Sequence, residues 1–177
     1  MALSPMRGPH TPVVDGEALY QQLLNEIRML HLHLPVAATR LPAVSAWSVG
    51  EHLSHMARLD IVVAPRLLGP TPEDPGLTPA GPEALAIIAA GTLPRGRARA
   101  PASVQPTTTD PAGLLAELQA AERSIQSLHS RLASLCADAS LIRHTVFGGL
   151  NRRQMLEIMS IHHRHHLAII ADIRAGS

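Results

Sequence analysis

The sequence has no lysine and almost no aromatic residues. Its 15 basic side chains are all arginine, and 14 acidic residues nearly balance them, so the formal net charge is only +1. This balance gives no electrostatic reason to expect nucleic acid or a membrane as a partner. We attribute the absence of lysine to a GC-rich coding bias rather than to function. Aromatic residues make up 2% of the chain, which disfavours sheets, where aromatic side chains are enriched.

Cysteine and long apolar runs are also scarce. The single Cys136 cannot form a disulfide within the chain, which favours a reducing compartment. Its apolar helical surroundings predict a buried structural thiol rather than a nucleophile. No apolar run reaches the roughly 20 residues of a transmembrane helix. Residues 1–12 carry one arginine and no long apolar core, unlike a signal peptide. We therefore expect a cytoplasmic protein.

Four stretches of the chain carry apolar residues at helical spacing. They predict helices at residues 15–34, 48–68, 111–137 and 151–174. The predicted starts carry capping signals, namely Asp15, Ser48 with Glu51, Asp110 before Pro111, and Asn151 with Gln154. A further short helix is expected at residues 83–90. Residues 138–150 are expected to form the connection between the third and fourth long helices.

The lengths of the connections predict how these helices pack. Short loops join the first helix to the second and the third to the fourth, so each of these pairs is expected to be antiparallel. About 40 residues separate the second helix from the third, enough to cross the length of a bundle. We predict an all-α fold, a four-helix bundle with up-down-down-up order and a long crossover between helices 2 and 3. Residues 1–13 are expected to form a flexible leader, and residues 14–177 a single domain.

Four histidines lie within five residues of the last predicted helix, at His162, His163, His165 and His166. Residues four apart on a helix lie on one face, and His162 and His166 fall on the apolar stripe of this helix. Two imidazoles at this spacing are half of a metal site. His163 and His165 are expected on the flanks, as partners of the ligands or as surface residues.

The third ligand is expected from helix 2, because an antiparallel arrangement brings its start to the level of the histidine pair. His55 is the preferred candidate, and His52 is its rival. His144 precedes the last helix and is expected to be structural. The nearby acidic residues Glu51, Asp60 and Glu157 are expected as surface charges in preference to partners of the ligands.

Two segments of the chain resemble the DinB-like (DinB/YfiT) metal-binding four-helix proteins. Residues 47–56 resemble their "WS-x-x-E-h-l-x-H" segment, and residues 147–150 with 162–167 resemble their "FG-x-l … H-x-x-H-H-l" ending. Residues 99–106 also resemble their crossover, so the likeness spans about residues 15–173. It implies an up-down-down-up bundle with a metal held by His55, His162 and His166. The small polar pair usual after the last histidine is replaced here by Ala168 and Ile169.

Some DinB-like proteins are transferases and isomerases that use low-molecular-weight thiols. The resemblance therefore implies a metal-dependent, thiol-dependent transferase acting on a small molecule, with one divalent ion and a low-molecular-weight thiol as cofactors. Zinc or nickel is favoured, and iron or manganese also fits. The alternatives are a metal-dependent hydrolase and a non-catalytic module that binds a metal or small ligand. A homodimer is also expected, since leucine- and alanine-rich faces on helices 1 and 3 leave apolar surface uncovered.

Overall fold

The structure, a computed structural model, describes residues 15–96 and 99–177. The leader expected at residues 1–13 lies outside the described residues. The described chain is mostly helical and carries one small two-stranded sheet. The α-helices are α1 (Gly16–His31), α2 (Val49–Leu68), α3 (Pro82–Ala90), α4 (Pro111–Gln126), α5 (Leu132–Ala137) and α6 (Arg152–Ala175). The 3-10 turns are η1 (Leu34–Val36), η2 (Ala102–Val104) and η3 (His129–Arg131), and the strands are β1 (Leu141–His144) and β2 (Gly148–Asn151).

The long helices begin where the capping signals predict. The Ser48 hydroxyl accepts from the Glu51 backbone N–H while the Glu51 carboxylate accepts from the Ser48 N–H, and Asn151 and Gln154 form the same reciprocal pair. The Asp15 and Asp110 carboxylates accept from backbone N–H groups in the first turns of α1 and α4. These bonds satisfy donors that a helix start leaves open, so local sequence is sufficient to place the starts.

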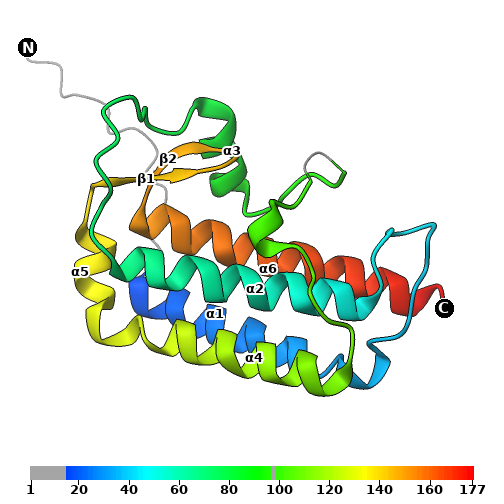
Figure 1. The fold of residues 1–177 in the computed structure, drawn as a ribbon. Helices are drawn as coiled ribbons and strands as arrows, with labels where there is room; N and C mark the ends of the chain where they lie inside the picture. The colour runs from blue at the N-terminus through cyan, green and yellow to red at the C-terminus, as the bar shows by residue number, and fades with distance from the viewer. Residues whose placement is uncertain (1–14, 97–98) are drawn as a thin grey trace, which may run out of the picture.

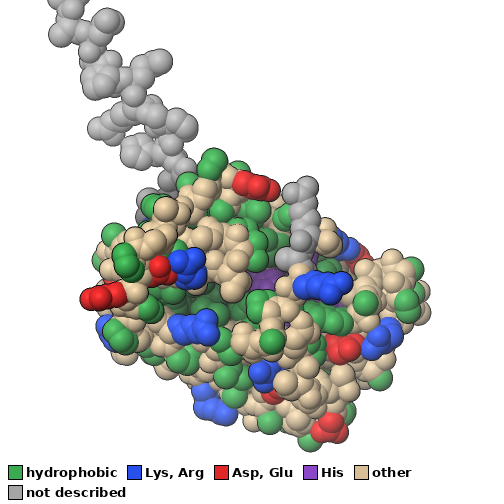
Figure 2. All heavy atoms as spheres, turned by 45° about the horizontal axis from the view of Figure 1, so that its top comes forward, with side chains coloured by type: hydrophobic (Ala, Val, Ile, Leu, Met, Phe, Trp, Pro, Cys, Tyr) green, Lys and Arg blue, Asp and Glu red, His purple; other side chains and the backbone are tan. Residues whose placement is uncertain are grey.

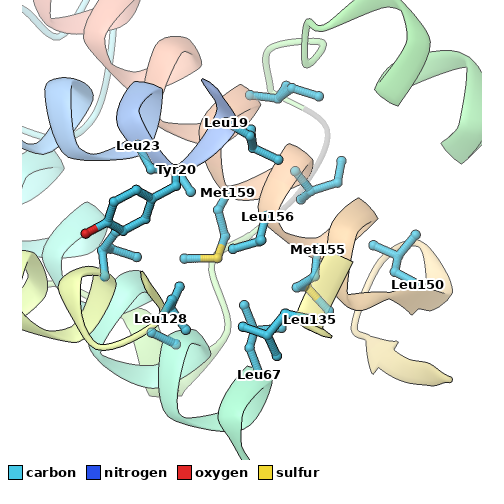
Figure 3. Packing of buried hydrophobic residues seen from close by; sticks show 14 of the residues in the cluster. Leu19, Tyr20, Leu23, Leu67, Leu128, Leu135, Leu150, Met155, Leu156 and Met159 are labelled. Carbon is cyan, nitrogen blue, oxygen red and sulfur yellow. The ribbon is translucent and has the colours of Figure 1, made fainter. Parts of the chain in front are cut away.

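The helices α1, α2, α4 and α6 lie side by side (Figure 1). Helix α4 packs against α1 and α2, and α6 packs against the same two helices. Leu23, Leu67, Leu128 and Met159, which come from different parts of the chain, point toward one another between them (Figure 3). Each fully buried side chain of this size contributes about 1.5–3 kcal/mol, so the apolar core stabilises the fold without help from an ion.

The third predicted helix is broken. It forms as three elements, α4, η3 and α5, and the first of them ends at Gln126. The hydroxyl of Ser127 donates to the Ser124 carbonyl, a local bond that competes with continued helix. Leu128, Leu132 and Leu135 remain buried across the break, so the predicted apolar stripe is preserved although the helix is not.

The connection expected at residues 138–150 contains a β-hairpin in which β1 and β2 pair antiparallel. The crossover extends this hairpin, since the Ala80 N–H donates to the Gly149 carbonyl and the Gly149 N–H donates to the Thr78 carbonyl. A Cβ atom on Gly149 would lie 2.6 Å from that Thr78 oxygen, so only glycine allows this approach. The hairpin and the crossover are thereby held together above α2 and α6 (Figure 1).

Within the described part of the chain, no helix combines the length and apolar character that a membrane crossing requires.

Candidate metal centre

The structure brings His55, His162 and His166 together. His55 lies on α2 and the other two lie on α6, and one nitrogen from each falls within 4.8 Å of the others. The Nε2 atom of His162 lies 3.4 Å from Nε2 of His55 and 2.9 Å from Nε2 of His166. The three residues predicted from the sequence therefore point their imidazole nitrogens at a common position.

A backbone carbonyl orients His55. Its Nδ1 atom lies 2.7 Å from the carbonyl oxygen of Val104 in η2. A carbonyl only accepts, so Nδ1 must carry the proton, and the Nε2 lone pair then faces the other two histidines. The crossover thus fixes the tautomer that metal binding requires, a contribution that sequence spacing does not reveal.

A chain of hydrogen bonds lies behind His166. Its Nδ1 atom lies 2.8 Å from Nδ1 of His52, and Nε2 of His52 lies 3.0 Å from the hydroxyl of Ser45. A proton on Nδ1 of His166, donated to His52, would leave the Nε2 lone pair of His166 free for the cluster. His52, the predicted rival of His55, therefore supports His166 and is not a member of the cluster.

The donor set fits a divalent cation. Burial lowers the pKa of His55, and burial followed by the charge of neighbouring histidines lowers the pKa values of His162 and His166 well below the usual value. The three rings are therefore neutral at pH 7 and keep their lone pairs. Two nitrogens bound to one tetrahedral zinc ion lie roughly 3.3 Å apart, from bond lengths near 2.0–2.1 Å. The Nε2 separations of His162 from His55 and His166, 3.4 and 2.9 Å, are of that size.

His163, expected on a flank of α6 as a partner of the ligands or as a surface residue, is not on the surface but fully buried between two carboxylates. Its Nε2 atom lies 3.0 Å from Oδ1 of Asp60 on α2, and its Nδ1 atom lies 3.5 Å from Oε2 of Glu26 on α1. Burial alone would lower the pKa of His163, but Asp60 and Glu26 raise it to about 9. The three side chains form a buried ionic cluster that joins α1, α2 and α6.

The surface position expected for Asp60 is therefore wrong, since its side chain is completely buried. Asp60 falls on the same helical stripe as Leu53, Met56, Ala64 and Leu67, all of which are buried. A charged residue on an apolar stripe is the signal that could have identified it, because a buried charge requires a partner.

A cavity of about 570 Å³ lies beside the three histidines. This volume is in the range of small-molecule sites. Trp47 forms part of the wall, with its ring centroid 4.9 Å from that of His55 and 6.2 Å from that of His166. Figure 2 shows histidine side chains inside a hollow whose surroundings are largely hydrophobic.

His144 lines the same cavity, although its sequence position suggested only a structural role. Its Nδ1 atom accepts hydrogen bonds from the backbone N–H groups of Val146 and Phe147, so its neutral ring carries the proton on Nε2. The hairpin that bears His144 folds back over α6, and this long-range contact explains its place in the cavity.

Comparison with family models gives a match to the DinB superfamily over residues 17–170. Comparisons with curated proteins and with solved structures give no significant match. The matched region includes all the helices from α1 to the histidine-bearing part of α6, together with the three clustered histidines. The chain therefore belongs to the DinB superfamily.

Proposed function

We propose that the protein is a metal-dependent, thiol-dependent transferase acting on a small molecule, in which the thiolate sulfur displaces a leaving group that departs with its bonding electron pair. The convergence of three imidazole Nε2 atoms beside a largely apolar cavity is the observation that carries this proposal. His55, His162 and His166 would hold a divalent ion, with zinc or nickel preferred. The ion would lower the pKa of a thiol bound beside it.

The protein's own residues supply orientation and a largely apolar wall. The Val104 carbonyl holds His55, and the His52–Ser45 chain holds His166. Most of the described lining residues are apolar and offer few partners to a bound hydroxide, which favours a thiol as the attacking group. This apolar wall is the reason for preferring the transferase over the hydrolase and the non-catalytic binding module.

The test is turnover of the untagged, metal-loaded protein with 1-chloro-2,4-dinitrobenzene as a model electrophile, with and without an added thiol such as cysteine or glutathione. We expect conversion above the protein-free rate only when metal and thiol are both present. Conversion without thiol would support the hydrolase instead. Stoichiometric metal with no turnover under either condition would support the binding module.

We also propose the up-down-down-up order for the four long helices. Contacts of α2 with α4 and with the η3 turn that follows α4 advance in the same direction along the sequence, from Ser54 with Glu117 to the Leu68 carbonyl with Arg131, which supports a parallel pair. Contacts between α2 and α6 run in opposite directions, from His52 with His166 to the Leu67 carbonyl with Arg152, which supports an antiparallel pair.

A homodimer is a further proposal. The described surface exposes large apolar side chains near α1 and α4, including Met29, Leu32 and Leu115. Burying them against a second copy would stabilise a dimer. We expect sedimentation velocity at micromolar concentration to show a dimer, and Leu115→Glu to shift it toward monomer, with Arg123→Glu on the same helix as control. A monomer alone in the unmodified protein would contradict this proposal.

A further inference from the structure

We infer that the cavity binds a molecule with an apolar body and one anionic group, and that Arg66 and Arg99 bind the anion. This inference rests on the proposed function, because it names the substrate class of the same site. It is carried by the composition of the cavity wall and by the distribution of charge at its edge.

The wall selects an apolar body. Its described residues are mainly aliphatic and aromatic, from α2, α3, the hairpin and α6, and include Leu59, Val63, Ile87, Phe147 and Met159. Several of these lie against the apolar core cluster and are themselves partly buried. A ligand with a hydrocarbon or aromatic body would remove this surface from water, the dominant favourable contribution to binding in such sites.

The charged residues of the wall select an anion. Arg66, Arg99 and Arg143 contribute three positive charges, and Glu83 is the acidic residue among the described lining side chains. Arg143 is held by Asp74, with contacts of 2.7 and 2.8 Å. Within residues 15–96 and 99–177, neither Arg66 nor Arg99 has an acidic side chain within ion-pair distance. Among the described residues, the guanidinium groups of Arg66 and Arg99 therefore carry positive charge that no ion pair neutralises.

The two arginines are exposed, whereas the metal-facing histidines are buried or half-buried. Basic side chains lie around the hollow in which the histidines are visible (Figure 2). A ligand that places its apolar body against the wall can thus direct its anionic end outward to the guanidinium groups. Guanidinium binds carboxylate, sulfonate or phosphate through paired hydrogen bonds. A cationic ligand would face uncompensated positive charge at the same place.

A matched pair of fluorescent probes tests the inference. 1-Anilinonaphthalene-8-sulfonate and N-phenyl-1-naphthylamine share an apolar body and differ by the sulfonate. We expect the metal-loaded protein to bind the sulfonate at least about tenfold more tightly. Arg66→Gln and Arg99→Gln should each weaken sulfonate binding about fivefold, the size expected of a partly exposed charge contact. Neither should change binding of the neutral probe. Arg123→Gln, on the exposed face of α4 and outside the cavity, is the matched control and should change neither.

Equal affinity for the two probes would overturn the inference. So would an equal loss in the Arg123→Gln control, or no saturable binding of the sulfonate. The same titrations on protein treated with a chelator, together with metal analysis and thiol turnover, separate the two proposals. Selective sulfonate binding by a protein that takes up no metal would leave this inference standing and remove the proposed function. Metal-dependent thiol turnover with no preference between the probes would do the reverse.

Discussion

Replacing His166 with alanine is expected to abolish stoichiometric metal binding while leaving the fold intact. His166 supplies one of three converging nitrogens, and a two-histidine remnant leaves a divalent ion with too few protein ligands to be held. The apolar core does not involve this ring, so the helical circular dichroism spectrum should be unchanged. Elemental analysis of untagged protein after zinc or nickel loading and gel filtration is the measurement.

His165→Ala is the matched control for this change. His165 is a neighbouring histidine of α6 that also lines the cavity but does not belong to the triad. We expect its replacement to leave one ion per chain, with affinity reduced at most about 10–100-fold, the usual cost of losing a supporting group. If His166→Ala protein still retains one ion per chain, or if the unmodified protein stays metal-free with zinc, nickel, iron and manganese, the triad is not a metal site.

Asp60→Ala is expected to destabilise the protein by about 3–5 kcal/mol, the cost of leaving one member of a buried ion pair without its partner. Asp60 and His163 are both fully buried and lie 3.0 Å apart. Loss of the carboxylate removes the group that most raises the pKa of His163. It also leaves a cavity between α2 and α6. Urea unfolding followed by circular dichroism should show a large fall in the midpoint at unchanged slope.

The control for this change is Asp74→Ala, which removes a carboxylate from the more exposed ion pair with Arg143. Exposed pairs contribute about 0–1 kcal/mol, so the midpoint should move little. A loss below about 1 kcal/mol for Asp60→Ala, or equal losses for both variants, would contradict the expected cost of leaving His163 without its buried partner.

Much of the site follows from local rules. The i, i+4 geometry of a helix places His162 and His166 on one face whatever the rest of the chain does. Reciprocal capping bonds start α2 at Ser48 and α6 at Asn151, because the partners are three residues apart. The spacing of apolar residues is equally local. It correctly predicted which side chains are buried on both sides of the break between α4 and α5. His55 needed more than spacing, namely the expected antiparallel packing of two helices and the family resemblance.

The sequence by itself therefore determined the apolar stripes, the starts of the long helices and the paired histidines of α6. Only the tertiary structure decided what surrounds them. The partner that orients His55 is 49 residues away, the one behind His166 is 114 away, and Asp60 is 103 residues from His163. Such contacts depend on the orientation of each helix about its own axis and on which loop covers the histidines. For the same reason the hairpin, the place of His144 and the cavity became visible only once distant segments were packed together.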